Sequence, residues 1–227
     1  MIYKAGKIKD DTIIYHEGKF YLFAMYHKEN SDKFNNVWLA ISDDGVNFKD
    51  YGCVVEDFPS FIWAMRVYKI ENGFMMNSGS FDSGGNQSVL KFWYSKDLIN
   101  WEYKPELDLF SPVIEGENMR LDCANILSEN GKFYGYATGQ FGFITSDDGM
   151  HWKAEKQRIN YYPFPEYNTV LGGFEIADFI KFEDKYYLFC GGFGHLGTNG
   201  YGEFLELFFL TFAALLGFKS HLYEKIA

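Results

Sequence analysis

Cysteine is scarce in this sequence, and basic residues are outnumbered by acidic ones. The 227 residues include three cysteines, Cys53, Cys123 and Cys190. Because they are widely spaced and odd in number, they predict neither a disulfide framework nor a zinc site. Such cysteines fit a reducing compartment.

The shortage of basic residues also excludes whole classes of partner. Lys and Arg number 21 against 31 Asp and Glu, which gives a net charge of -10. Nucleic acids and anionic membranes are bound by clustered Lys and Arg, and no such cluster occurs here. The first residues, MIYKAGKIKDD, also lack the apolar segment of a secretory signal. We therefore expect a cytoplasmic protein that binds neither nucleic acid nor membrane.

Aromatic residues, by contrast, are abundant. They make up 20% of the chain, and the apolar residues together make up 47%, which is enough for a substantial core. Most of the Phe and Tyr residues fall in short apolar or alternating runs that are broken by a tight polar turn. This pattern is typical of β-hairpins. Four such hairpins are predicted, from the runs TIIYHEGKFYLFAMYH, VYKIENGFMMNSGS, NILSENGKFYGYATG and FIKFEDKYYLFCGG.

A second motif recurs after the first three hairpins, as ISDDGVNF, YSKDLINW and TSDDGMHW. Its serines, Ser42, Ser95 and Ser146, are 53 and 51 residues apart. Ser and Asp side chains cap turns, and the closing Phe or Trp can pack between sheets, so the motif predicts a structural role. The hairpins show the same period, measured on the aromatic residue that opens each second strand: Phe20, Phe74, Phe133 and Tyr186.

A repeat of roughly 50 residues that contains a hairpin, a third strand and a turn into a fourth strand is typical of a propeller blade. The sequence therefore predicts an all-β protein, a β-propeller with about four recognisable four-stranded blades. We expect a propeller domain over residues 1–202, with blades at about 8–56, 60–108, 118–160 and 172–202 onward.

The end of the chain, residues 203–227, does not continue this pattern. Its apolar run from Phe204 to Phe218 is short for a membrane-spanning helix. It could form a helix or strand buried against the propeller. We favour the interpretation that the chain is a truncated or frame-shifted version of a longer one, in which a closing blade is missing.

Acidic residues stand at one repeated position in three of the hairpins. Counting eleven residues back from the aromatic of the second strand gives Trp63, Asp122 and Glu175. The turn in YHEGK is expected to be one residue shorter than the turn in LSENGK, so the matching position in the first hairpin is ten before Phe20, which is Asp10. Because the first strand of each blade lines the central channel, the three carboxylates are expected at one mouth of it. Like charges held close together are costly, which favours a function over a purely structural role.

The same residues carry a resemblance to a known family. The segment DDTIIYHEGKFYLF resembles the opening of glycoside hydrolase family 43, and WAMRVYKIENG is similar to the strand of its second blade. The segments DCANILSENGKFYGYATG and FEIADFIKFEDKYYLFCGG resemble its third and fourth blades, so the resemblance covers residues 8 to 200. It implies a five-bladed propeller, with an acidic triad in the channel mouth. The related family 32 fructosidases share this architecture.

By this resemblance, Asp10 would be the general base, Asp122 would orient and tune the acid, and Glu175 would be the general acid. The pattern departs from the family where Asp11, Cys123 and Met65 replace prolines. Asp11 is therefore an alternative to Asp10 as the base. Strand alternation favours Asp10, because it puts the two on opposite faces and only Asp10 shares a face with Thr12 and Ile14.

Four further residues are candidates for substrate binding. Trp63 occupies the acid position of the second blade and could stack on a sugar ring or belong to the core. Arg66 could contact substrate hydroxyls or lie at the surface. Phe141 and His195 fall in glycine-rich loops that follow second strands. The sequence predicts no cofactor and no metal ligand; calcium could bind at the channel axis, but no motif requires it.

Two functional classes remain open at this stage. The first is a glycoside hydrolase, exo- or endo-acting on oligosaccharides or polysaccharides that contain arabinose or xylose, and inverting through an acid and a base. Fructans are a second substrate class, although the WMNDPNG signature of family 32 is missing. The second functional class is a catalytically impaired carbohydrate-binding propeller or a truncated remnant.

Overall fold

The computed structural model describes residues 6–29, 31, 33–82, 84–85, 87–111, 113–114, 117–118, 121, 125–137, 142–154, 171–195 and 201–208. These residues belong to two compact units, residues 1–160 and residues 161–227. In the described residues the regular structure is almost entirely β, with one short 3-10 helix, Pro105–Leu107. The predicted fold class, all-β, is confirmed.

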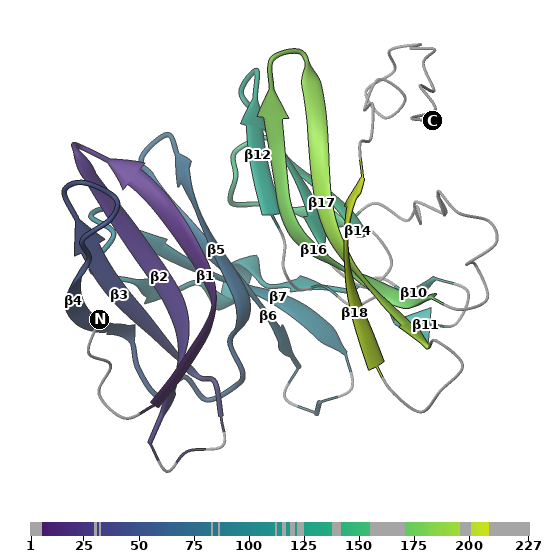
Figure 1. The fold of residues 1–227 in the computed structure, drawn as a ribbon, viewed down its shortest axis with the longest axis horizontal. Coiled ribbons are helices and arrows are strands. Elements are labelled where there is room, and N and C mark those ends of the chain that lie inside the picture. The colour runs from purple at the N-terminus through teal and green to yellow at the C-terminus, as the bar shows by residue number, and fades with distance from the viewer. Residues whose placement is uncertain are drawn as a thin grey trace. The chain divides into compact units, whose positions relative to one another are not determined.

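The first sheet of the unit 1–160 is a four-stranded antiparallel meander in which each strand pairs with the next along the chain. Figure 1 shows these strands side by side, coloured purple to blue. Its strands are β1 (Gly6–His16), β2 (Lys19–Lys28), β3 (Asn36–Ser42) and β4 (Lys49–Val55).

The second sheet repeats this order and adds a short strand at its edge. Its main strands are β5 (Trp63–Ile70), β6 (Gly73–Phe81), β7 (Ser88–Ser95) and β8 (Glu102–Tyr103). The added strand, β9 (Leu109–Phe110), pairs with β7. A glycine is required at Gly73, where φ is 143° and a Cβ would lie 2.5 Å from the carbonyl oxygen of Ser95.

The third sheet has the same four-strand order again. It consists of β12 (Asn125–Glu129), β13 (Lys132–Ala137), β14 (Gly142–Ser146) and β15 (Lys153–Ala154). A separate pair, β10 (Val113–Ile114) and β11 (Glu117–Asn118), comes before it in the chain.

The unit 161–227 contains a three-stranded antiparallel sheet. Its strands are β16 (Leu171–Phe182), β17 (Lys185–His195) and β18 (Tyr201–Phe208). The segment from residue 203 onward was expected to form a helix, a strand or a tail, and its start is a strand. Residues 203–208 lie in β18 and pair with β17 as a third blade strand would, because their apolar side chains suit a strand as well as a tail. The rest of the predicted tail lies outside the described residues.

Each hairpin that opens a sheet has a turn of two residues. The flanking pairs are His16 with Lys19, Ile70 with Gly73, Glu129 with Lys132, and Phe182 with Lys185. In the third sheet the turn is Asn130–Gly131, with φ values of 51° and 75°. Positive φ at both positions is the type I′ geometry that matches the twist of the strands, and Asn-Gly is its preferred sequence.

The Ser/Asp motif closes the turn from the third to the fourth strand in the first, second and third sheets, as predicted. In the second sheet the Ser95 hydroxyl accepts the backbone N–H groups of Asp97 and Leu98, at 3.2 and 2.9 Å. The Asp97 carboxylate accepts those of Ile99 and Asn100, at 2.9 and 2.8 Å. The same bonds recur in the turns at residues 42–47 and 146–151. The motif is therefore structural.

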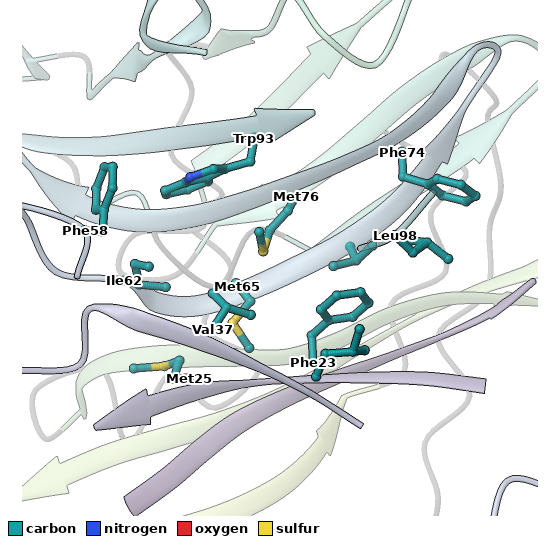
Figure 2. Close-up of a cluster of buried hydrophobic side chains, with 12 residues drawn as sticks. Phe23, Met25, Val37, Phe58, Ile62, Met65, Phe74, Met76, Trp93 and Leu98 are labelled. Atoms are coloured by element: carbon teal, nitrogen blue, oxygen red, sulfur yellow. The ribbon is translucent and has the colours of Figure 1, made fainter. Parts of the chain in front are cut away.

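Apolar side chains fill the space between the first and second sheets. Phe23 and Met25 of β2 belong to the same cluster as Met65 of β5 and Met76 of β6 (Figure 2). Trp101, which ends the Ser/Asp motif of the second sheet, contacts Phe23 edge-on at 5.7 Å. The motif thus joins its own sheet to the preceding one.

The second and third sheets are joined in the same way. Trp152, which ends the third copy of the motif, packs against Tyr68 and Phe92 of the second sheet. The Tyr68 hydroxyl donates to the carbonyl oxygen of Gly149 at 2.7 Å and accepts the indole N–H of Trp152 at 3.1 Å.

The first strands of the three sheets are neighbours. Strand β5 contacts β1 on one side and β12 on the other. Four-stranded meanders whose first strands gather together are the arrangement of propeller blades. Among the described residues, no helix is long and apolar enough to cross a membrane.

Replacing Asp97 with Ala is expected to lower the free energy of unfolding at pH 7 by about 1 kcal/mol, the usual cost of a lost side-chain cap. Hydrogen bonds from the backbone and side chain of Asn100 lower the pKa of Asp97 to about 2, against the opposing effect of burial. Because this pKa lies below the ordinary value of about 3.9, the contribution is complete above pH 5 and declines as pH falls from about 4 to 2.

Urea unfolding followed at several pH values measures this difference. The neighbouring exposed residue provides a matched control, and Lys96→Ala should change stability little. A loss for Asp97→Ala that is equally large at pH 2 would contradict the assigned role of the carboxylate.

Candidate functional site

The predicted site residues fall into three groups: those with a described side chain, those with a described backbone only, and those outside the described residues. Asp10, Trp63 and Arg66 lie in the unit 1–160 with their side chains described. Glu175 and His195 lie on β16 and β17 of the unit 161–227, where the backbone is described. Asp122 and Phe141 lie outside the described residues.

Asp10 lies in a β-bulge of β1. Between the pairs Lys9 with Met25 and Thr12 with Phe23, the two residues Asp10 and Asp11 lie opposite the single residue between those partners, Ala24. Asp10 has φ of 51°, in the left-handed region that Asp tolerates better than most residues. Its carboxylate lies 3.3 Å from the ammonium group of Lys9 and its side chain is 38% exposed. The bulge thus presents a charged, solvent-accessible carboxylate.

The pairing of β1 corrects the expected alignment of the four hairpins. In every hairpin the aromatic residue that opens the second strand pairs with the residue five positions earlier in the sequence. The pairs are Phe20 with Tyr15, Phe74 with Lys69, Phe133 with Ser128, and Tyr186 with Lys181. The expectation of a shorter turn in the first hairpin is therefore wrong. Lys9, and not Asp10, has the same register as Trp63 and Glu175, because each pairs with the residue five after the hairpin aromatic.

The bulge also removes the argument that favoured Asp10 over Asp11. Alternation of side chains holds along a regular strand, but an extra residue disturbs it locally. Asp10 and Asp11 are both exposed, whereas Thr12 and Ile14 are partly buried. Either carboxylate can serve as a base here, and the choice between them stays a prediction.

Trp63 lies at the start of β5 within a group of aromatic rings. Its ring stacks on Phe61, with centroids 5.2 Å apart, and meets the edge of Phe81 at 4.9 Å. Its backbone N–H donates to the Ser78 hydroxyl at 2.8 Å. The ring is partly buried against the core between the first and second sheets, so Trp63 is both a core residue and a partly exposed aromatic surface.

Phe61 and Phe81 were not expected near the site. Phe61 lies just before β5, and Phe81 is the last residue of β6. The pairing of β5 with β6 brings Phe81 next to Trp63. The alternation of Phe61 and Trp63 was the one sequence signal for this group. A three-ring surface of this kind suits stacking against the apolar face of a sugar.

Arg66 connects two neighbouring first strands. Its Nε donates to the side-chain oxygen of Asn125 on β12 at 2.7 Å, and its Nη1 donates to the carbonyl oxygen of Met65 at 3.0 Å. The guanidinium is partly buried. Arg66 and Asn125 have the same register in their hairpins, since each pairs with the residue three after the hairpin aromatic. The structure thus assigns Arg66 a bond between strands, and a contact with substrate stays a prediction.

Glu175 lies on β16, where it pairs with Gly191 of the glycine-rich second strand. It is followed by a register shift between Ile176 and Asp178, comparable to the shifts of β1 and β5. Asp178 shares the register of Arg66 and Asn125, because its partner Phe189 stands three residues after Tyr186. Glu175 thus stands three residues before this position, as Asp122 does before Asn125.

No metal centre is found in the described part of the chain, where no three His, Cys, Asp or Glu side chains gather closely enough to hold an ion. Among the cysteines the side chain of Cys53 is described, as a free thiol. Burial and the nearby charge of Glu56 raise its pKa to about 11, so the thiol stays protonated and is a poor nucleophile at neutral pH.

No family model matches the sequence, and no curated protein matches it. Solved structures do match. An α-L-arabinofuranosidase from Lactobacillus brevis superposes with a TM-score of 0.66 at 13% identity, over 88% of this chain and 72% of that one. An exo-β-1,3-galactanase from Clostridium thermocellum gives a TM-score of 0.60 at 16% identity, over 88% and 48%.

A family 32 β-fructofuranosidase from Bombyx mori gives a TM-score of 0.56 at 15% identity, over 97% of this chain and 54% of that one. These similarities show the fold, which is that of the propeller glycoside hydrolases. The chain spans about half the length of the galactanase and fructofuranosidase structures.

The bond between Arg66 and Asn125 is expected to stabilise the contact of the second and third sheets. Arg66→Leu and Asn125→Ala should each lower the free energy of unfolding by about 1 to 2 kcal/mol, because each removes one partner of a charge-assisted hydrogen bond. The double variant should lose less than the sum, with a coupling of at least about 0.5 kcal/mol.

Urea unfolding of the four proteins measures this coupling. Lys69→Ala, an exposed change on the same strand, serves as the control and should leave stability nearly unchanged. Strictly additive losses would mean that the bond contributes no stability.

Proposed function

We propose that this protein is a glycoside hydrolase that cleaves glycosidic bonds through a pair of carboxyl groups. The carrying observation is that Glu175 stands on β16 three residues before Asp178, which is the sequence spacing of Asp122 before Asn125, in a fold shared with solved glycoside hydrolases. The exposed carboxylates of Asp10 and Asp11 in the bulge of β1 add the candidate base.

In the proposed mechanism Glu175 is the general acid that protonates the leaving oxygen. Asp10 or Asp11 is the general base that activates a water molecule on the opposite face of the sugar. Asp122 orients and tunes the acid. Separate acid and base groups without a covalent intermediate give inversion of configuration at the anomeric carbon.

The proposed substrates are glycans that contain arabinose or xylose. The arabinofuranosidase similarity supports the arabinose part of this proposal. Trp63, with Phe61 and Phe81 around it, would stack on a sugar ring, and Arg66, Phe141 and His195 are proposed as further substrate contacts. Fructans are an alternative substrate, supported by the fructofuranosidase similarity. A catalytically impaired carbohydrate-binding propeller is the alternative function.

Replacing Glu175 with Gln tests the role of the acid. With aryl α-L-arabinofuranosides and aryl β-D-xylosides, we expect kcat to fall by about 10² to 10⁴ for phenyl leaving groups, because they need protonation as the bond breaks. For dinitrophenyl leaving groups, which need little protonation, the fall should be much smaller. This dependence on the leaving group separates loss of an acid from general damage to the site.

Glu183→Gln is the matched control, because it makes the same change in the hairpin turn that follows the same strand, at an exposed position. It should retain wild-type rates. Equal background rates for the wild type and Glu175→Gln would overturn the enzymatic proposal, and measurable binding of the same sugars would then favour the carbohydrate-binding alternative.

The base is identified by a paired comparison of Asp10→Asn and Asp11→Asn. We expect one of the two to lose about 10² to 10⁴ in kcat with every leaving group, because activation of water is needed for all of them. The anomer formed first, followed by proton NMR, should have inverted configuration. Retention of configuration would contradict the proposed division between acid and base.

A further inference from the structure

The second sheet of the unit 1–160 has two apolar faces, one packed on the first sheet and one on the third. We call the face of a sheet that packs on the preceding sheet its front face, and the opposite one its rear face. The front face of the second sheet is formed by Val67, Phe74, Met76, Trp93, Ile99 and Trp101. In the third sheet the front face is formed by Ile126, Phe133, Ile144, Met150 and Trp152.

The first sheet has a front face of the same composition. In the second sheet Val67 pairs with Met76, and Met76 pairs with Trp93. The equivalent pairs in the first sheet join Ile13 to Leu22 and Leu22 to Ala40. The Ser/Asp turn of the first sheet adds Val46 and Phe48, at the positions of Ile99 and Trp101. The equivalent front-face residues are therefore Ile13, Phe20, Leu22, Ala40, Val46 and Phe48.

These residues differ from their counterparts in exposure. Ile13 is 51% exposed, whereas Val67 at the same position of the second sheet is 9% exposed. Val46 in the turn is 79% exposed, whereas Ile99 and Met150 at that position pack on the core against the preceding sheet. The front face of the first sheet thus carries the pattern that is buried twice elsewhere in the molecule, but it is open to solvent at these positions.

A front face packs against the rear face of the preceding sheet, and the rear faces of the first and second sheets have the same residue pairing. Rear faces present an apolar residue of the first strand that pairs with an apolar residue of the second strand: Ile14 with Tyr21 in the first sheet, and Tyr68 with Met75 in the second. Both pairs lie in the cores between sheets. A partner for the front face of the first sheet therefore needs this same pairing.

The sheet of the unit 161–227 supplies it. Ile180 of β16 pairs with Tyr187 of β17, in the register of Ile14 with Tyr21. Phe182 takes the register of His16 and Ile70, the last residues of β1 and β5. His16 contacts Phe74 of the next sheet at 4.8 Å, so this position belongs to the rear face. Ile180 and Phe182 are 37% and 61% exposed, so this rear face too is open to solvent.

We propose that the front face of the first sheet binds the rear face of the β16–β17 sheet in a second copy of this chain. The contact continues the two interfaces already present within the unit 1–160, with the same residue positions on each side. It joins two different surfaces, so the association is head to tail and further copies can add to a dimer. Burial of exposed aromatic and aliphatic side chains drives it. The proposal does not depend on the proposed glycosidase activity.

The full chain is tested by sedimentation velocity over a wide range of protein concentration. The wild type should associate into dimers and larger species as concentration rises. Val46→Asp on the front face and Phe182→Asp on the rear face should each weaken self-association about tenfold or more, because each places a charge in an apolar contact. Asn72→Asp adds the same charge to an exposed turn outside both faces and should associate like the wild type.

Mixing the two variants distinguishes head-to-tail contact from any other association. Val46→Asp keeps an intact rear face and Phe182→Asp keeps an intact front face, so the mixture should form dimers that cannot grow further. Circular dichroism of each variant confirms that the sheets are intact. A wild type that stays monomeric at every concentration would overturn the proposal, as would variants that associate normally or a mixture that forms no dimer. A monomer whose Val46 region resists labelling would show that another segment of the chain covers the face.

Discussion

Packing of one apolar sheet on the next is the interaction on which the rest of this structure depends. A four-stranded meander of this size has two apolar faces and cannot bury them alone. The Ser/Asp turns place Trp101 and Trp152 against the preceding sheets, and the cores between sheets form around them. Because each turn is held by its own hydrogen bonds, the position of its aromatic residue is set locally before the sheets meet.

The candidate site depends on this packing through the first strands. Stacking of the sheets brings β5 into contact with both β1 and β12, and Arg66 of β5 donates a hydrogen bond to Asn125, which has the same register on β12. A register shift that also occurs in β5 falls in β1 at Asp10 and Asp11, and both side chains are exposed there. Irregular backbone on a rigid sheet is a common way to present a reactive group, because the sheet fixes the strand while the bulge redirects the side chains.

Much of the fold could be predicted from the chain, but the alignment of the acidic residues could not. The two-residue turns, the three Ser/Asp motifs and the period of roughly 50 residues are local patterns, and all three motifs form the expected turns. The position of Asp10 was assigned by assuming a short turn. The pairing shows no such difference, because His16 pairs with Lys19 as Glu129 pairs with Lys132, and the strand partners that fix the register are not visible in the spacing of one chain segment. The partners of Arg66 and Trp63 come from other strands, so no local signal revealed them.

The sequence by itself determined the class of the fold, the order of strands within the sheets and the Ser/Asp turns, because these depend on residues that are close together in the chain. Tertiary structure decided the register of Asp10, the bond from Arg66 to Asn125 and the aromatic group around Trp63. It also decided which apolar faces are buried and which are exposed, as Val67 and Ile13 show at one repeated position. The physical reason is that burial depends on the neighbouring sheet, which a repeat unit does not encode within itself.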